Sequence, residues 1–574
     1  MKNLQHIGIL VLSLILLNGC YDLDQYPADS ITAGNFWRTQ DDADQAMMGV
    51  YNAMKRDDAF GIYYTRDCLT DIGDGYNGGV YGYTEVAQAK SSAADGVYLS
   101  VWTRMYDGIA RANTFLAHVP DVEMSDELKT QYIAEARFMR ALFYNELLNL
   151  FGEVPLYDET TLIDKEFATM LNPRSEVSVV RDFILADLDE AAKSLPATRG
   201  ADAKGRATQG AAYALKGKVL LYAGQYKEAS QAFEQVMNGG YGYTLYPQYA
   251  ELFKPGGDES SEMIFAIQNL GGAGTEYGMP VFYIGNRSSY GGCINCLVPS
   301  NKLVDMYEYK DGRPFDWDEL FPGFTTNTEV KEKVFKCTFD EDGKYVVDYP
   351  EYKDRLVTMY DERDPRMKET ILLPYTIYPG WVNNEARDCE FVIASPNPSM
   401  ENNGYVRNAF GNNSYLYRKF VPEGNMDGLI DDRFNSPTNF PLIRYADVLL
   451  MLAECYNKTG NQGGAVSLIN LVRERAGMPG INSGPAYLAA HSEEEVFERI
   501  KHERAIEFAA EGLRFFDLKR WGIYEEEVND HKQYDLLDKV LATKKVSSKN
   551  YLWPIPQTER EKNSKLTQNT GWGE

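Results

Sequence analysis

Three glutamates near the C-terminal end of the chain are spaced four residues apart, which places their carboxylates on one face of a helix. The cluster comprises Glu503, Glu507 and Glu511, interleaved with Arg504, Arg514 and Arg520. Such a cluster suits either acid–base catalysis or a buried lattice of ion pairs, because both need several partly desolvated charges close together. Each acid has a nearby arginine that would hold it ionised rather than raise its pKa towards neutrality. We therefore favour a structural lattice.

The helices that must carry this cluster are predicted by the hydrophobic periodicity of residues 440–522. Apolar side chains recur at helical spacing in three runs, at 443–456, 465–472 and 496–516. Gly460 and Gly477 follow the first two runs as stop signals. Ser492 and Glu495 form a capping box before the third run. The sequence therefore predicts three consecutive helices, the last of which carries the charged cluster.

This region also resembles a known family. The runs RYADVLLMLAECYN, LINLVRERAG and HERAIEFAAEGLRFFDLKRWG are similar to the C-terminal signature of the SusD/RagB family of Bacteroidetes surface lipoproteins. Members of that family capture nutrients, usually glycans, and sit over a SusC/RagA-type TonB-dependent transporter. The resemblance implies a SusD-like fold, an oligosaccharide ligand and a SusC-like partner. A peptide is the alternative ligand, as in RagB-like proteins.

The N-terminus has the pattern of a lipoprotein leader. Lys2 precedes an apolar run at 7–17 that is too short to span a bilayer, and the run ends in Leu17-Asn18-Gly19-Cys20, which resembles a lipobox. We expect residues 1–19 to be removed and Cys20 to be lipidated; the alternative is a plain secretory signal with an incidental cysteine. The resemblance implies an outer-membrane lipoprotein that faces outward and touches the membrane only through this lipid.

Charge and motifs exclude several other functions. The formal net charge of −26, with no basic run, argues against nucleic acid and against electrostatic docking on anionic lipid. The sequence contains no HExxH, P-loop or nucleophile elbow, and we expect no cofactor and no metal. A secreted glycoside hydrolase is the enzymatic alternative, but its two carboxylates cannot be identified among 84 acidic residues.

Six cysteines remain besides Cys20, and six cysteines allow 15 pairings. They are Cys68, Cys293, Cys296, Cys337, Cys389 and Cys455. Cys455 lies in an apolar helical run, so we expect a free core residue. Cys293 and Cys296 form a CxxC beside Gly291-Gly292, for which we expect a local disulfide rather than a redox centre or a zinc site.

Helical periodicity extends through the N-terminal part of the chain. Amphipathic helices are predicted at 41–56, 95–118, 125–150 and 175–195. Residues 207–236 then match a tetratricopeptide hairpin, in which small residues such as Gly217 let two helices approach and aromatics such as Phe233 fill the gap. We infer helix pairs that stack into a right-handed solenoid, as in the SusD family.

The predicted fold is mainly α, with a tetratricopeptide-like helix-pair scaffold and one large insertion. Residues 20–574 are expected to form a single SusD-like unit, with N-terminal repeats at 20–238 and a C-terminal helical segment at 440–574. At 239–439 the helical period disappears, which predicts a loop-rich insertion that carries short β-hairpins. One hairpin is predicted at 335–347, with Asp342-Gly343 at its turn.

Aromatic and polar residues gather on a glycine-rich loop at 63–83. This composition suits a carbohydrate, since sugar C–H faces stack on aromatic rings and hydroxyls bind acids and arginines. The resemblance pairs such a loop with segments from mid-chain, here 283–296 and 363–366. The candidate ligand residues are Asp67, Asp71, Tyr76, Tyr81, Tyr83, Tyr283, Tyr290, Cys296, Arg363 and Arg366. The alternative for each tyrosine is a packing role in the irregular region.

Overall fold

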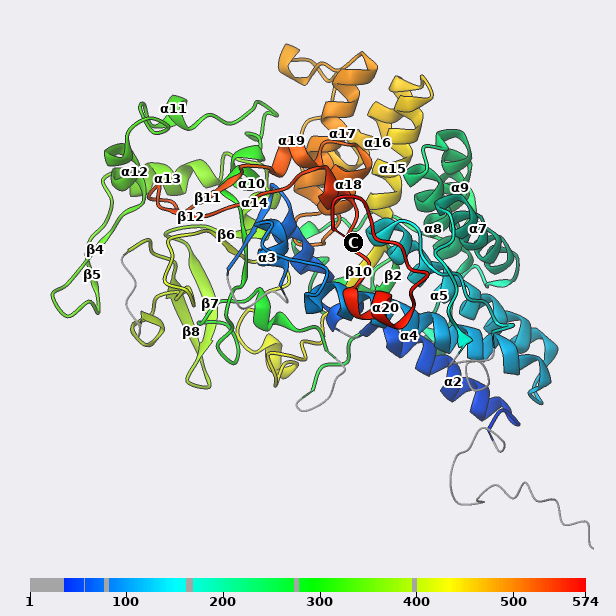
Figure 1. Cartoon of the computed structure of the whole chain (residues 1–574). Helices are drawn as coiled ribbons and strands as arrows, with labels where there is room; N and C mark the ends of the chain where they lie inside the picture. The colour runs from blue at the N-terminus through cyan, green and yellow to red at the C-terminus, as the bar shows by residue number, and fades with distance from the viewer. Residues whose placement is uncertain are drawn as a thin grey trace, which may run out of the picture.

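The computed structural model describes residues 36–55, 57–76, 82–161, 169–272, 278–394 and 400–573. The predicted leader, Cys20 and Tyr81 lie outside these residues. Long helices fill one side of the molecule, while loops and short hairpins fill the other (Figure 1). The C-terminal helices lie between the two.

The N-terminal helices are close to those predicted. They are α2 (Gln40–Asn52), α3 (Tyr83–Ala87), α4 (Gly96–His118), α5 (Asp126–Phe151), α7 (Val177–Ser194), α8 (Gln209–Tyr222) and α9 (Tyr226–Asn238). The long helices pack in chain order, α4 on α5, α5 on α7, α7 on α8 and α8 on α9. The side chain of Ser125 accepts a hydrogen bond from Leu128 N at the start of α5, as an N-cap serine does.

The α8–α9 pair confirms the predicted role of its small residue. A Cβ atom at Gly217 would lie 2.4 Å from the ring of Phe233, so the two helices approach as closely as they do only because position 217 has no side chain. Phe233 is fully buried in this contact. The periodicity of small and aromatic residues therefore set the geometry of this hairpin.

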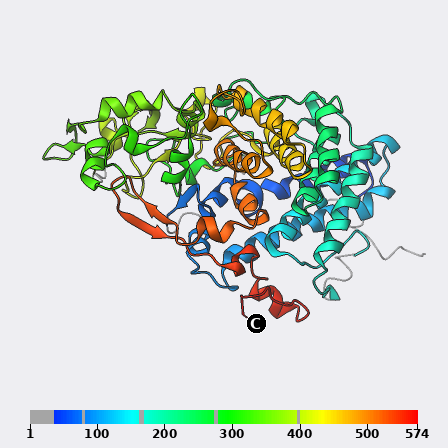
Figure 2. The same ribbon diagram turned by 90° about the horizontal axis from the view of Figure 1, so that it is seen from above.

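The stack continues in the C-terminal part of the chain. Its helices are α15 (Tyr445–Lys458), α16 (Gln462–Arg475), α17 (Glu493–Glu507), α18 (Arg514–Arg520), α19 (Tyr524–Val528) and α20 (Gln557–Lys562). Helix α15 packs against α9, which precedes it by some two hundred residues, and Figure 2 shows these helices side by side. The insertion therefore leaves the solenoid and returns to it.

The prediction of one continuous third helix through residue 516 was wrong. Helix α17 ends at Glu507, and α18 starts at Arg514 after a turn in which Ala510 and Gly512 have φ angles of 63° and 73°. A Cβ atom at Gly512 would lie 2.2 Å from the carbonyl oxygen of Tyr63. The chain breaks here because the backbone of a distant segment packs directly against it.

The insertion holds short helices and most of the described strands, which form two-stranded antiparallel pairs with one another or with strands elsewhere in the chain. Its helices are α10 (Asn301–Met306), α11 (Trp317–Leu320), α12 (Thr328–Phe335), α13 (Lys353–Tyr360) and α14 (Arg366–Thr370). The strand pairs are β1 (Gly73–Gly75) with β3 (Leu297–Pro299), β2 (Met263–Ile267) with β10 (Phe440–Arg444), β4 (Thr338–Phe339) with β5 (Val346–Asp348), β6 (Ile371–Leu372) with β9 (Leu416–Tyr417), β7 (Ile377–Val382) with β8 (Glu385–Glu390), and β11 (Lys532–Tyr534) with β12 (Val540–Thr543). The predicted hairpin is confirmed as β4–β5, although Phe335 belongs to α12. The fold is thus mainly α with short hairpins, as predicted.

The predicted disulfide between Cys293 and Cys296 was wrong. Both are free thiols in the interior, and burial raises the pKa of each to about 12, so both remain protonated at neutral pH. Cys455 is a free, buried residue of α15, as predicted. Among the helices of the described residues, none combines the length and the apolar character that a membrane span requires.

The close contact at Gly512 gives a first prediction. Replacement of Gly512 by Ala should lower the free energy of unfolding by about 3 kcal/mol or more, because left-handed strain of about 1–2 kcal/mol adds to overpacking against Tyr63. Gly522 is the matched control: its φ is 75°, and no described atom lies within 4 Å of its Cβ position. Gly522→Ala should cost only the strain. If urea denaturation showed equal losses of unfolding free energy for Gly512→Ala and Gly522→Ala, the packing explanation would be refuted.

Candidate functional site

The loop at residues 282–296 is an ordered turn that several distant segments hold in place. Within it, Cys293 N donates to Asn286 O at 3.0 Å, and Ile294 N donates to Phe282 O at 2.9 Å. Gly291 and Gly292 both have φ near 70°, a conformation that favours glycine. Because its backbone polar groups are paired, this loop can present side chains from a fixed frame.

Several other segments bond to this loop. Trp381 N donates to Ser288 O at 2.8 Å, Arg287 N donates to Arg407 O at 3.0 Å, and Asn295 Nδ2 donates to Asn408 Oδ1 at 3.0 Å. The first aromatic loop joins through Tyr76 N, which donates to Cys296 O at 3.0 Å, and through the β1–β3 pair. The structure therefore brings Tyr76 against the mid-chain segment 283–296, the two regions that the family resemblance had paired.

Aromatic rings gather around the loop. This aromatic cluster comprises Tyr76, Phe282, Tyr283, Tyr290, Trp381, Phe410 and Phe434. Tyr290 and Trp381 are stacked, with ring centroids 5.9 Å apart and planes 25° apart. Phe282 lies 4.7 Å from Phe434, and Tyr76 lies 4.8 Å from Phe410, centroid to centroid. Phe410 and Phe434 are 38% and 40% exposed, so the cluster reaches the surface.

Polar groups lie among these rings. The guanidinium of Arg433 is 4.5 Å from the centroid of the Phe282 ring, and its Nη1 donates to Gly291 O at 2.7 Å. Asn286 Nδ2 and Arg287 Nε are buried donors for which the described residues provide no acceptor. A buried donor without a partner costs about 1–3 kcal/mol, so each calls for an oxygen from water or ligand. Exposed ring faces beside such donors suit a polyhydroxylated ring.

Seven of the described candidate ligand residues are buried. Tyr76 is one of them, but its ring packs against the partly exposed ring of Phe410. The other six lie in the interior. They are Asp67, Asp71, Tyr83, Cys296, Arg363 and Arg366. Asp71 is paired with Arg514 and Lys302, each at 2.9 Å, and Arg363 donates to Val304 O at 2.7 Å. The charged groups among them, such as Asp71 and Arg366, stabilise the fold, because a buried ion needs a partner of opposite charge. We therefore leave these six out of the site that we propose, and keep Tyr76, Tyr283 and Tyr290.

Sequence reasoning missed Trp381, Phe410, Phe434 and Arg433. Phe410 stands between Asn408 and Gly411-Asn412, and Trp381 follows Pro379-Gly380. An aromatic residue alone in a polar, glycine-containing stretch has little apolar chain around it to pack against. That was the signal in the loop at 63–83, and it also marked these two positions.

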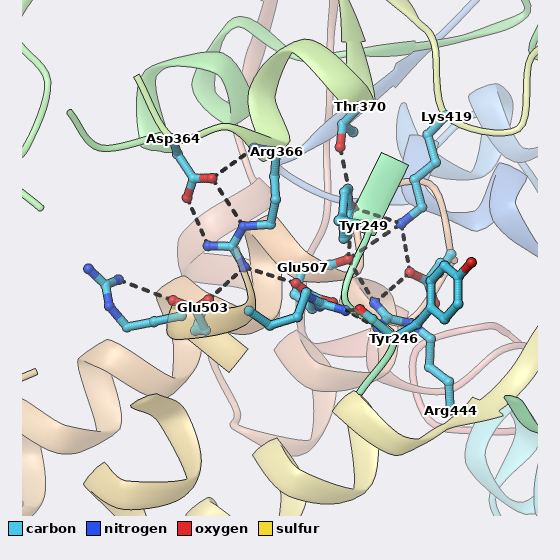
Figure 3. A network of polar contacts seen from close by, with 12 residues as sticks. Tyr246, Tyr249, Asp364, Arg366, Thr370, Lys419, Arg444, Glu503 and Glu507 are labelled. Carbon is cyan, nitrogen blue, oxygen red and sulfur yellow. Dashed lines mark hydrogen bonds and ion pairs between the residues drawn. The ribbon is translucent and has the colours of Figure 1, made fainter. Parts of the chain in front are cut away.

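Arg366 belongs to a network of buried ion pairs between the insertion and α17 (Figure 3). Its Nη1 donates to Glu503 at 2.6 Å and to Glu507 at 2.8 Å. Arg444 Nη1 donates to Glu507 at 2.7 Å, and Arg444 Nη2 donates to Glu511 at 2.8 Å. Burial alone would raise the pKa of Glu507, but Arg475, Arg444 and Arg366 hold it well below its usual range. The charged cluster is thus a structural lattice, as we favoured.

A sequence model of the SusD family matches residues 261–572, more than half of the chain. The chain belongs to the SusD family. A second family model, described as "Starch-binding associating with outer membrane", matches residues 31–221. The first match contains the residues of the lattice, and the second contains helices α2 to α7.

Relatives of this SusD-family chain extend over nearly its whole length. A SusD-like protein of Formosa agariphila is 25% identical over 99% of each chain. The starch-binding protein SusD of Bacteroides thetaiotaomicron is 22% identical over 82% of this chain and 78% of its own. Among solved structures, a SusD-like carbohydrate-binding protein of Bacteroides fragilis matches 93% of this chain and all of its own, with a TM-score of 0.75 at 24% identity. These similarities confirm the fold.

The lattice predicts a large effect of a single substitution. Arg444→Met should lower the free energy of unfolding by about 3–5 kcal/mol, because Glu262, Glu507 and Glu511 would lose a buried partner. Lys333→Met is the control, since the Lys333–Glu351 pair is exposed, and its unfolding midpoint should not change. Equal denaturation midpoints for Arg444→Met and Lys333→Met would contradict the structural role of the lattice.

Asp67 predicts a pH dependence. Burial raises the pKa of Asp67 to about 7. The hydrogen bond from Ala510 N lowers this pKa but offsets only part of the effect of burial. Between about pH 4 and pH 7 the folded protein keeps a proton that the unfolded chain has lost, so the contribution of Asp67 to stability falls as pH rises. The free energy of unfolding of Asp67→Asn, relative to the wild type, should therefore rise across this window. If urea titrations at several pH values gave a constant difference in the free energy of unfolding between the variant and the wild type, this pH dependence would be refuted.

Proposed function

We propose that this SusD-family protein is a non-enzymatic, glycan-binding lipoprotein of the outer membrane. It captures oligosaccharides at the aromatic cluster and delivers them to a SusC-like TonB-dependent transporter. The observation that carries this proposal is the cluster itself, with partly exposed rings and buried donors on an ordered loop. The named relatives support the ligand class: one is called starch-binding, and a protein of similar fold, with a TM-score of 0.61, is called laminarin-binding.

The cluster suits a chain of sugar rings for physical reasons. Tyr290 and Trp381 present nearly parallel planes on which the C–H face of a sugar can stack. Aromatic side chains have only two χ angles, so holding them in place costs little conformational entropy. Asn286 and Arg287 add donors for hydroxyl oxygens at the same loop. A ligand of this kind would be bound by stacking and oriented by hydrogen bonds.

We propose binding without turnover. A glycosidase needs two carboxyl groups about 5–9.5 Å apart across the scissile bond, one of them with a raised pKa. Near the cluster, Asp432 accepts hydrogen bonds from Phe434 N and Asn435 Nδ2, and Glu423 is paired with Arg418 at 2.6 Å. These carboxylates have structural partners. Incubation with oligosaccharides should therefore give no new reducing ends, and their appearance would favour the hydrolase alternative.

The membrane part of the proposal rests on the sequence. Lipidation of Cys20 would tether residues 20–574 as a single unit at the outer surface, and a tethered binder needs a transporter to move its cargo inward. Solubilised with mild detergent, the native protein should copurify with a TonB-dependent barrel. Cys20→Ser should move it out of the membrane fraction. Migration of the wild-type protein alone, or an unchanged fraction for the variant, would contradict this part.

The ligand site gives a direct prediction. Trp381→Ala and Tyr290→Ala should each weaken oligosaccharide binding about tenfold, because loss of a stacked ring removes about 1–1.5 kcal/mol. The measurement is isothermal titration of the purified protein against starch, fructan, pectin, mannan and mucin oligosaccharides. Tyr534→Ala, on the separate β11–β12 pair, is the control and should bind like the wild type.

Two other outcomes of this titration would change the proposed site or the proposed ligand class. Oligosaccharide binding that survives both substitutions would place the site outside the aromatic cluster. Binding of oligopeptides in the same titration, with no binding of any glycan, would establish the peptide-binding alternative and overturn the proposed ligand class.

A further inference from the structure

A separate cavity of about 520 Å³ lies between the N-terminal helices and the C-terminal end of the chain. Its volume falls in the range of about 300–1,000 Å³ that is typical of small-molecule sites. None of its described lining residues belongs to the aromatic cluster. The side chains that matter here are Trp102, Tyr106, Tyr157, Ala110, Glu559 and Lys562, and we call this cavity the α4–α20 pocket.

The C-terminal segment forms one wall of the pocket because hydrogen bonds hold it across α4 and α5. Gln557 N donates to Ala93 O at 2.9 Å, just before α4, and Trp553 N donates to Leu150 O at 2.7 Å, in the last turn of α5. Asn563 Nδ2 donates to Asn172 O at 2.8 Å. Helix α20 therefore lies beside α4, as Figure 1 shows, and the wall is part of the fold.

The described inner surface of the pocket is mainly apolar, and Trp102, Tyr106 and Tyr157 contribute aromatic rings to it. The rings of Trp102 and Tyr106 pack with centroids 5.1 Å apart. The hydroxyl of Tyr106 donates to Pro155 O at 2.7 Å, and the hydroxyl of Tyr157 donates to Met170 O at 3.1 Å. Since both hydroxyls are engaged with backbone carbonyls, these tyrosines offer their ring faces rather than polar tips. Such a surface favours a planar apolar group.

The polar end of the pocket is an ion pair whose acid lies deeper than its base. Lys562 Nζ donates to Glu559 Oε1 at 2.7 Å, and the Glu559 side chain is 23% exposed whereas that of Lys562 is 66% exposed. Both residues of the pair line the pocket together with Tyr106 and Tyr157. The pair is neutral overall, and it places a strong hydrogen-bond acceptor beside an aromatic wall.

We infer that the α4–α20 pocket binds a neutral aromatic ligand that carries a hydroxyl group, of the class of phenols and aryl glycosides. The ring lies against Trp102, Tyr106 and Tyr157, and the hydroxyl donates to Glu559. A charged ligand is disfavoured because Lys562 already neutralises the acid. The inference does not depend on glycan binding at the aromatic cluster.

The probe for this inference is 2-naphthol, whose intrinsic fluorescence reports its transfer from water to an apolar site. Titration of the purified protein should give saturable binding. Glu559→Leu should weaken that binding tenfold or more, because it removes the acceptor. It should not alter the binding of 2-methoxynaphthalene, which has the same rings and no donor. Equal effects of the substitution on the two probes would overturn the assigned role of Glu559.

Filling the pocket tests its location. Ala110→Trp should abolish binding of both probes, and Thr103→Trp, at an exposed position that also lines the pocket, provides a second filled variant if the first fails to fold. Tyr534→Ala, on the separate β11–β12 pair, is the control and should bind 2-naphthol like the wild type. Absence of saturable binding to the wild type, or unchanged binding to a folded filled variant, would overturn the inference.

Discussion

Arg444 is the side chain on which the arrangement of this molecule most depends. It ends β10 and bonds to Glu262, which precedes β2, and to Glu507 and Glu511, which lie at and after the end of α17. Removing such charges from water costs several kcal/mol for each ion, and only complete pairing offsets that cost. The insertion can therefore pack on the helical stack in only one arrangement, in which each of these buried acids is paired with an arginine.

The consequences extend from the lattice to the aromatic cluster. Immediately after Glu507 the chain turns at Ala510, whose N–H donates to Asp67, and Arg514 at the start of α18 is paired with Asp71. These contacts fix the first loop, whose strand β1 pairs with β3 at the end of the loop 282–296. A loop that has little secondary structure of its own is thereby held from several sides, which is what a preorganised binding surface requires.

Periodicity in the sequence was sufficient to predict the helices, because the apolar face of each one packs on its neighbour in chain order. The spacing of Gly217 and Phe233 in the sequence was enough to predict that they pack against each other. The break at Gly512 could not be predicted, since it follows from contact with Tyr63, more than four hundred residues away. The same limit applied to the CxxC, whose spacing permits a disulfide while the fold encloses each thiol separately.

The site was harder to predict for a related reason. Asp67, Asp71, Arg363 and Arg366 have the composition of a ligand loop, and only their distant partners show that they stabilise the interior. Conversely, Trp381 and Phe410 come from separate stretches, and each meets Tyr290 or Tyr76 only in the folded chain. Residue type indicated the kind of ligand, whereas tertiary contacts decided which residues remained available for it.

We propose that the lattice holds the aromatic cluster in place for a sugar chain. The measurement that tests it most directly is a crystal structure of the protein with a bound oligosaccharide, compared with the ligand-free crystal. We expect a sugar ring stacked on Tyr290 or Trp381, with the loop 282–296 and the ion pairs of Arg444 unchanged between the two crystals. An oligosaccharide bound at another surface, or a loop that rearranges to receive it, would show that the lattice does not hold a preformed binding surface.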